Sequence, residues 1–468
     1  MFATLYIELI EYIVILIALT GLIYVVKKPI VAFYIMVFTL PFKNFYVWVG
    51  TDLHVWKLLS IAFLIIQSPK WLLQQKRVNK TNRYIFMIVA YFIYAVFITA
   101  INGYFFDKSS VLLMSGGFFK NEGRFIFQFL LFIITLNLIM IPMQIFKSTT
   151  EVVTTVKVLL YALTVLAVFG VIQYSIMQLM GVDIFPIHGS DGIEHSGYIY
   201  SQYGSVFRLN SLAGEPKHLA IAMVIGICIV ILGRASEIKI VKYDLLVLVL
   251  FSFNLVFTYS TTGYTLIAMT LLMVVITQGV TNWRAIALVF CVLIMAFYAY
   301  NNLTIDSATA IDTQIQRTGL EIQDETILSY LLDEPAHAII GTGLGNIHHF
   351  AVQYLPINYP IFRDTPYKAN SGILYMLADV GLIGMSLLYI SLGALLWNNM
   401  ILLKSVRGVY HSEMKVVIYA SLIVSVLFLA RYYELFFMLF GVMLSLNYLL
   451  RNMLKTEKSE LKRLNRHA

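Results

Sequence analysis

The first residues that could do chemistry lie in FRLNSLAGEPKHLA, residues 207–220. Four ionisable side chains stand directly before an apolar stretch: Arg208, Glu215, Lys217 and His218. Pro216 suits the first turn of a helix, and a helix N-terminus attracts anions through its unpaired N–H groups. Because arginine can grip a phosphate through two parallel hydrogen bonds, we expect a phosphate-binding site with Glu215 as a candidate general base. The alternative is a salt-bridged helix cap at a membrane interface.

A second informative stretch is LLDEPAHAIIGTGLGNIHHF, residues 331–350, in which Gly341, Gly343 and Gly345 alternate. It lacks the strand and helix context of a dinucleotide fingerprint. We expect the glycines to let the backbone approach another chain segment or a ligand closely. His348 and His349 follow without the spacing of a zinc site, so a hydrogen-bonding role is expected for them and no metal.

A third stretch, KANSGILYMLADVGLIGM, spans residues 368–385. It leads into an apolar run and carries Asp379 some way into it. An acid within a bilayer is by default a functional candidate. The alternative is a cap residue near the membrane surface.

The elements that must position these residues are membrane helices. The chain is 60% hydrophobic and only 12% charged, which excludes a water-soluble enzyme and a disordered protein. The apolar runs are continuous rather than alternating, which favours helices over a barrel. We predict an all-α polytopic bundle of about 12–14 transmembrane helices. The candidate spans are 5–26, 29–49, 54–73, 83–102, 123–142, 152–180, 216–233, 244–262, 263–279, 284–300, 371–399, 414–430 and 434–450.

Charge placement predicts the orientation. The net charge is +8. Its main clusters all fall on one side of the predicted bundle, which the positive-inside rule assigns to the cytoplasm. They are Lys27 and Lys28; Lys70, Lys76, Arg77, Lys80 and Arg83; Arg234, Lys239 and Lys242; Lys404, Arg407 and Lys415; and the tail from Arg451 to Arg466.

The two longest polar segments, about 181–215 and 301–370, face the other way and are expected to be folded caps. Apolar residues within 315–332 predict short amphipathic helices in the second segment. The chain thus divides into N-terminal spans (1–180), central spans with the outer loop (181–300), a large extracytoplasmic loop (301–370), C-terminal spans (371–450) and a basic cytoplasmic tail (451–468).

Basic residues also occur away from the cytoplasmic side, and a cationic outer cavity for a pyrophosphate-linked lipid would explain them. Arg124 and Arg431 have acids nearby, Glu122 and Glu434, and simple pairing is the alternative for both. The full set is Lys43, Lys57, Lys108, Lys120, Arg124, Arg208, Lys217, Arg317, Arg363, Lys368 and Arg431.

The order of these motifs resembles the O-antigen polymerase and ligase superfamily. Arg208 precedes Glu215–Pro216 at the head of a span, a large loop ends in PAHAIIGTGLGN, and NSGILYMLADVGLIG opens the next span. Wzy-type polysaccharide polymerases are the nearest match. The resemblance covers residues 200–400.

The resemblance implies a metal-independent glycosyltransferase without a cofactor, in the bacterial cytoplasmic (inner) membrane, with its active site facing the periplasm or the cell exterior. Its substrates and partners would be undecaprenyl-pyrophosphate-linked oligosaccharides, the lipid bilayer and a chain-length regulator, with no nucleic acid. Arg208 would hold the pyrophosphate leaving group, and Glu215 matches the family acid. Fixed cations would then stabilise the departing charge.

The sequence departs from the family pattern at two positions. Asn370 stands where ligases carry a histidine, which argues against ligase chemistry; His218, His348 and His349 are possible substitutes as base. Thr261 follows Ser260 where many members carry an arginine. Arg317 is therefore the expected second phosphate contact, with Arg124 and Arg431 next. Further candidate contacts to phosphate or sugar are Lys217, His218, His348 and Asn370.

Three other functions remain open at this level. A ligase would transfer the polysaccharide to lipid A core, a protein or another acceptor. A transporter or lipid-linked oligosaccharide flippase would place its charges near the bilayer midplane. A non-catalytic assembly scaffold would leave the basic residues without an anionic guest.

Overall fold

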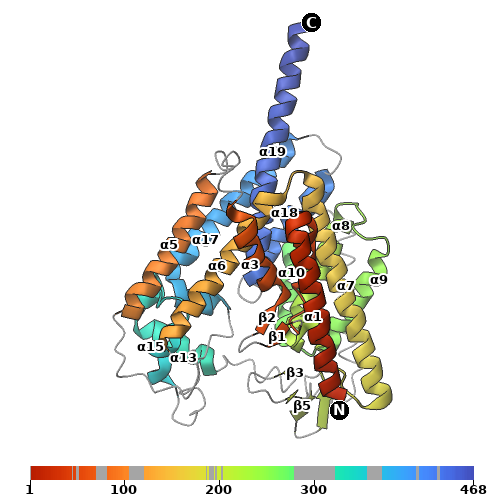
Figure 1. Ribbon diagram of the computed structural model, residues 1–468, viewed down its shortest axis with the longest axis vertical. Helices are drawn as coiled ribbons and strands as arrows, with labels where there is room; N and C mark the ends of the chain where they lie inside the picture. The colour runs from red at the N-terminus through yellow and green to blue at the C-terminus, as the bar shows by residue number, and fades with distance from the viewer. Residues whose placement is uncertain are drawn as a thin grey trace.

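The computed structural model describes residues 2–44, 46–48, 52–69, 82–104, 121–185, 187–188, 194–195, 198–201, 204–278, 322–355, 372–406, 411–428 and 433–467. It is a bundle of α-helices with its two termini at opposite ends (Figure 1). We call the end from which the C-terminal helix projects the upper end and the other the lower end. The longer helices are α1 (Phe2–Lys27), α2 (Pro29–Thr39), α3 (Val55–Ile66), α5 (Asn82–Tyr104), α6 (Asn121–Ile145), α7 (Thr149–Met180), α8 (Pro216–Ala235), α9 (Asp244–Phe257), α10 (Thr261–Gln278), α17 (Gly372–Ser405), α18 (His411–Phe428) and α19 (Tyr433–His467).

Within the described ranges, 5 helices are long and apolar enough to cross a membrane: Tyr84–Asn102, Thr149–Met180, Pro216–Ala235, Gly372–Ser405 and Glu434–Thr456. Shorter apolar helices occupy further predicted spans, including α2, α3, α9 and α10. An apolar helical bundle suited to a bilayer is therefore confirmed. The count of about 12–14 transmembrane helices stays a prediction, and the candidate span 284–300 lies outside the described residues.

Short elements at the lower end complete the fold. Three antiparallel two-stranded pieces, absent from the all-α prediction, are β1 (Tyr46–Trp48) with β2 (Asp52–His54), β3 (Ile187–His188) with β4 (Glu194–His195), and β5 (Tyr198–Ser201) with β6 (Gly204–Phe207). The short helices are α13 (Ile322–Asp333), α14 (Pro335–Ile340), α15 (Ile347–Ala351) and the 3₁₀ turns η3 (Ser211–Ala213) and η4 (Val352–Tyr354). The predicted short helices within 315–332 are thus represented by α13. Ile327 and Leu331 of α13 are buried in a small separate core with the start of α17.

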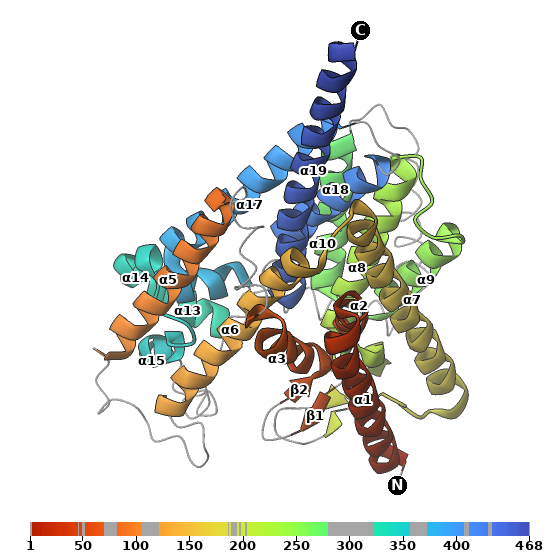
Figure 2. The ribbon, with the colours of Figure 1, turned by 45° about the horizontal axis from the view of Figure 1, so that its top comes forward.

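Helix α8 lies at the centre of the bundle. Its apolar side chains are buried almost all round, and it contacts α7, α9, α10 and α18. A helix that is apolar on every face belongs in such a position. By contrast α5 exposes Phe86, Ile93 and Phe97 on one side, as a lipid-facing helix does. Its other side runs along α17 in both views (Figure 1, Figure 2). Of the five long apolar helices found in the described residues, α8 is the most buried, so its N-terminus begins a well-packed element.

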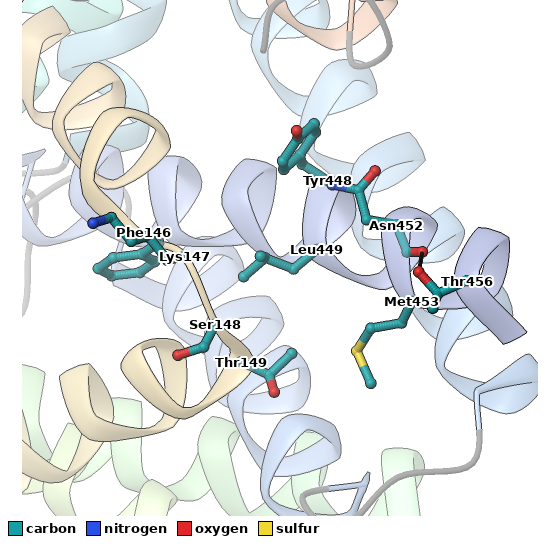
Figure 3. Close-up of a pocket in the computed structure, with 9 residues that line it drawn as sticks. All are labelled: Phe146, Lys147, Ser148, Thr149, Tyr448, Leu449, Asn452, Met453 and Thr456. Atoms are coloured by element: carbon teal, nitrogen blue, oxygen red, sulfur yellow. Dashed lines mark hydrogen bonds between the residues drawn. The ribbon is translucent and has the colours of Figure 1, made fainter. Parts of the chain in front are cut away.

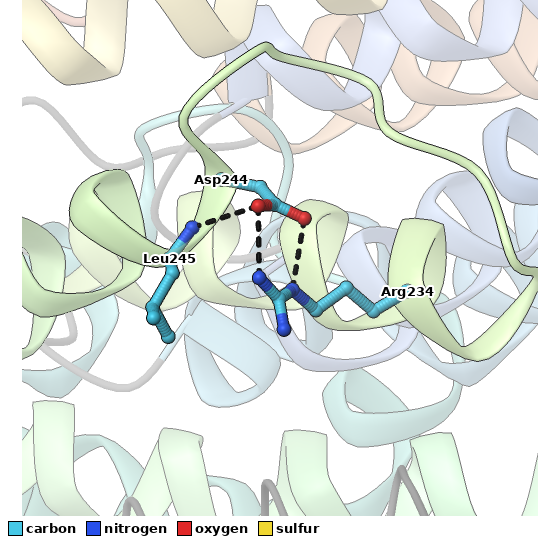
Figure 4. A network of polar contacts seen from close by, with 3 residues as sticks. All are labelled: Arg234, Asp244 and Leu245. Atoms are coloured by element: carbon cyan, nitrogen blue, oxygen red, sulfur yellow. Dashed lines mark hydrogen bonds and ion pairs between the residues drawn. The ribbon is translucent and has the colours of Figure 1, made fainter.

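An ion pair fixes the connection between α8 and α9. Arg234 Nε and Nη2 each donate to one carboxylate oxygen of Asp244 at 2.8 Å, and the Leu245 N–H donates to the same carboxylate (Figure 4). Arg234 lies in the last turn of α8 and Asp244 in the first turn of α9, so both charges also suit the helix dipoles. The pair holds the two helices as a hairpin.

Buried asparagines join helices elsewhere. Asn137 Nδ2 of α6 donates to the Ser60 carbonyl of α3 at 2.6 Å. Asn399 Nδ2 of α17 donates to the Met443 carbonyl of α19 at 3.0 Å and Asn399 Oδ1 accepts from Asn447 Nδ2 at 2.7 Å. Such bonds between apolar helices satisfy amides that hydrocarbon could not.

Candidate functional site

The segment from Arg208 to His218 lies at the lower end, between β6 and α8. Helix α8 begins at Pro216, as predicted, and Glu215 is its N-cap residue with an extended backbone (φ −133°, ψ 148°). The Glu215 side chain does not cap the helix. The first N–H groups of α8 therefore receive no hydrogen bond from the Glu215 side chain. Such N–H groups at a helix start attract anions.

A buried polar network holds this segment against α7. Gln173 Oε1 accepts from the Ser211 N–H at 2.8 Å, and Gln173 Nε2 donates to Asn210 Oδ1 at 2.6 Å and Asp183 Oδ1 at 2.8 Å. The Ser211 hydroxyl donates to the Leu166 carbonyl at 2.8 Å. Ser211 has φ 49°, a left-handed conformation that costs free energy in a residue with a side chain. The network keeps the loop in this shape.

Arg208 is fixed at the end of α9. Its Nε donates to the Thr258 carbonyl at 3.0 Å, and the neighbouring Leu209 N–H donates to Phe257 O at 3.0 Å. The residue as a whole is only partly buried. The hydrogen bond from Nε thus fixes the orientation of the Arg208 side chain.

Glu215 and His218 lie one helical turn apart. His218 Nδ1 is 3.8 Å from Glu215 Oε2, and the side chains are 26% and 56% exposed, respectively. Lys217 between them is partly buried. Glu215 is therefore accessible to a substrate hydroxyl, with no short ion pair to His218 covering it. This is what a general base requires.

Two further residues also lie here: Lys43, which belongs to the predicted outer basic set, and Asn44, which the sequence did not single out. Lys43 Nζ is 3.1 Å from Glu434 Oε1, at the start of α19. The next residue, Asn44, touches Gly214 so closely that a Cβ there would be 2.7 Å from Asn44 Oδ1. The turn after α2 thus packs against Gly214, the residue before Glu215. Nothing in the sequence alone could have paired Lys43 with an acid 391 positions away.

The glycine run 341–345 packs against a break in α17. Gly341 (φ 87°) and Gly381 (φ 62°) approach so closely that a Cβ on Gly341 would lie 2.6 Å from Asp379 O. The Gly343 N–H donates to Asp379 O at 2.9 Å, and the Gly345 N–H to Asp379 Oδ1 at 3.1 Å. The close approach predicted from the glycines is therefore to another chain segment. Asp379, 3% exposed, contributes a structural acceptor there.

Helix α5 completes that junction. Tyr94 Oη donates to Ile340 O at 2.7 Å, Asn102 Nδ2 to Gly341 O at 3.1 Å, and the Leu344 N–H to Thr99 Oγ1 at 2.9 Å. The glycine run thus joins α5 to the lower half of α17.

The remaining predicted residues are only partly placed. Arg317, Asn370 and Arg431 lie outside the described residues, as do the side chains of Arg124 on α6 and His348 on α15. Ser260 accepts from the Gly263 N–H at 3.3 Å and so caps α10. Of the predicted set, Glu215, Lys217 and His218 lie at the start of α8, and Arg208 lies earlier in the same segment, hydrogen-bonded to the end of α9.

A pocket of about 560 Å³ opens elsewhere, between the α6–α7 turn and α19 (Figure 3). Lys147, Ser148 and Asn452 line it together with apolar side chains. It includes the start of α7, whereas Gln173, which holds the candidate site, is near the other end of that long helix. This pocket is therefore separate from the candidate site.

Among the described residues, no group of three or more His, Cys, Asp or Glu side chains is placed to hold a metal ion. No protein-family model matches the sequence. No curated protein matches it either.

Proposed function

We propose that the protein is a Wzy-type polymerase: a membrane glycosyltransferase that joins undecaprenyl-pyrophosphate-linked oligosaccharide repeat units at the outer face of the bacterial cytoplasmic membrane. The observation that carries the proposal is the site at the start of α8. The segment held by Gln173 carries Arg208 and leads into the first turn of α8, where the Glu215 side chain is accessible and does not cap the helix, and where Lys217 adds a positive charge.

The chemistry follows from these groups. The acceptor sugar hydroxyl attacks the anomeric carbon of the donor, a C–O bond to the acceptor forms, and the C–O bond to the pyrophosphate breaks. Glu215 takes the hydroxyl proton, and the polyprenyl pyrophosphate leaves with the bonding electron pair. Arg208 and the N–H groups of α8 stabilise the charge that develops on it.

The position of the charges favours a transferase over a transporter. Arg208 and Glu215 precede the first turn of α8, and Arg208 is hydrogen-bonded to the carboxyl end of α9, so they lie at one end of the bundle. Alternating access would instead need a binding site near the middle of the spans.

The test is to incubate the purified protein with a lipid-linked repeat unit and resolve the products by size. We expect a ladder of chains that grows by one repeat, and we expect EDTA not to abolish it. Glu215→Gln keeps the size of the side chain but removes the base, and it should leave the substrate unextended. A single transfer to a different acceptor would indicate a ligase, and no product at all would contradict the proposal.

A further inference from the structure

Asn44 has a buried amide without a partner. The residue is 8% exposed, in the turn after α2. Its Nδ2 finds no hydrogen-bond acceptor among the described residues. A buried donor left unsatisfied destabilises a protein, because the group has lost its water without replacement. Such a group in a well-packed region requires an explanation.

The position of this amide is next to the candidate site. The Asn44 backbone N–H donates to Leu212 O at 3.3 Å, which ties the turn to the 208–216 segment. Its side chain packs against Gly214, one residue before the N-cap of α8, where φ is 84°. Asn44 Oδ1 is the atom closest to the Cβ position of Gly214, so the amide lies beside the residue that precedes Glu215, the N-cap of α8.

The adjacent ion pair fixes this turn. Lys43 and Glu434, 16% and 20% exposed, hold it against the start of α19. The Lys43 Cβ is 3.5 Å from the Cβ position of Gly214. The turn is therefore pinned on one side by α19 and on the other by Leu212. An amide held in this way is preorganised to donate to something that enters the site.

We propose that Asn44 is a further substrate-binding residue, whose Nδ2 donates a hydrogen bond to a phosphate oxygen of the lipid-linked diphosphate at the N-terminus of α8. The inference rests on the proposed function. It is favoured because the missing partner must be an acceptor, and Lys217 in the first turn of α8 and Arg208 in the segment before that helix attract an anion. Lys43 and Glu434 are positioning residues for this turn.

The test measures affinity and stability on the same samples. The purified full-length protein in nanodiscs is titrated with undecaprenyl pyrophosphate, and its melting temperature is recorded without ligand. For Asn44→Ala we expect about tenfold weaker binding, as for a lost hydrogen bond to a charged group. We expect its unliganded melting temperature to equal or exceed that of the wild type, because an unsatisfied donor has been removed. Asn44→Asp should bind more weakly still, since it sets a carboxylate against the phosphate.

The matched control is Asn399→Ala, which removes a buried amide whose hydrogen bonds are made within the bundle. It should lower the melting temperature and leave the affinity of the folded protein unchanged. Wild-type affinity in Asn44→Ala would overturn the inference whatever its melting temperature. If Arg208→Ala loses the probe while Asn44→Ala keeps it, the inference fails and the proposed function stands. A wild-type protein that does not bind the probe would overturn both.

Discussion

An ion pair between Lys43 and Glu434 joins an early and a late segment of the chain. Lys43 Nζ lies 3.1 Å from Glu434 Oε1, although the two residues are 391 positions apart. Both side chains are largely shielded from water, at 16% and 20% exposed. The pair connects the turn after α2 with the first turn of α19, beside the loop that carries Glu215. The pair therefore holds the turn that packs against Gly214 in a fixed position relative to α19.

Breaking this pair should destabilise the protein. Glu434→Gln leaves the Lys43 ammonium without its counter-charge in a poorly hydrated place, and we expect a loss of about 3 kcal/mol in the free energy of unfolding. The double variant Lys43→Glu with Glu434→Lys should recover part of it, because opposite charges again face each other. Thermal unfolding in detergent measures this. Single variants as stable as the wild type would show that the pair contributes nothing.

The junction of Gly341 and Gly381 should not tolerate a side chain. In Gly341→Ala the new Cβ meets the backbone at Asp379 O, and the positive φ adds about 1–2 kcal/mol. We expect a loss of about 3 kcal/mol or more in unfolding free energy. Gly393→Ala on α17 is the control, because a Cβ there meets nothing within 4 Å, and it should be neutral or slightly stabilising. Equal behaviour of both variants would contradict the close packing of the junction.

The role of Asp379 can be separated from catalysis. Asp379→Asn retains an oxygen that can accept from the Gly345 N–H, so we expect a folded protein that still forms product. Asp379→Ala removes the acceptor and should cost about 1–3 kcal/mol of unfolding free energy. Product formation and melting temperature are measured on each variant. Loss of activity in a stable Asp379→Asn protein would show that the carboxylate takes part in the chemistry.

His337 makes the α13–α14 region sensitive to acid. Its Nδ1 is hydrogen-bonded to the Tyr330 hydroxyl, and burial lowers the pKa of the imidazole, partly opposed by the charge of Glu334. The unfolded chain therefore takes up the proton first, near pH 6.5. The stability that neutral His337 confers is present above about pH 6.5 and is lost as the pH falls through its lowered folded-state pKa. His337→Gln should flatten this part of the stability curve.

Much of the helical architecture could be predicted because it depends on local signals. The start of α7 follows from the capping box of Ser148 and Glu151, and that of α8 from Pro216. The predicted span 29–49 is an exception, since α2 ends at Thr39. The reason is local too, because Pro41 has no N–H to continue the hydrogen bonds of the helix, although Leu40 before it keeps a helical backbone (φ −60°, ψ −38°).

The parts that could not be predicted depend on contacts between distant segments. Gln173 is an ordinary residue in a helix sequence, yet it orders the loop of the site. The break in α17 at Gly381 requires Gly341 of another element to fit against it. The candidate site itself could be predicted in part because Arg208 and Glu215 belong to one short segment. The contact between Asn44 and Gly214 could not be predicted, because it joins segments far apart in the sequence.

The central claim is that Arg208 stabilises a departing pyrophosphate, and the most direct measurement is the amount of long-chain polymer per molecule of membrane-inserted protein. We expect Arg208→Ala to reduce it about 10²–10³-fold, as for loss of a preorganised charge-stabilising donor. Arg208→Lys keeps the charge but not the fork, and should give an intermediate loss with the protein still present in the membrane. Arg234→Ala, at the opposite end of α8, should form chains in proportion to the protein that remains folded. Normal long chains from Arg208→Ala would contradict the claim.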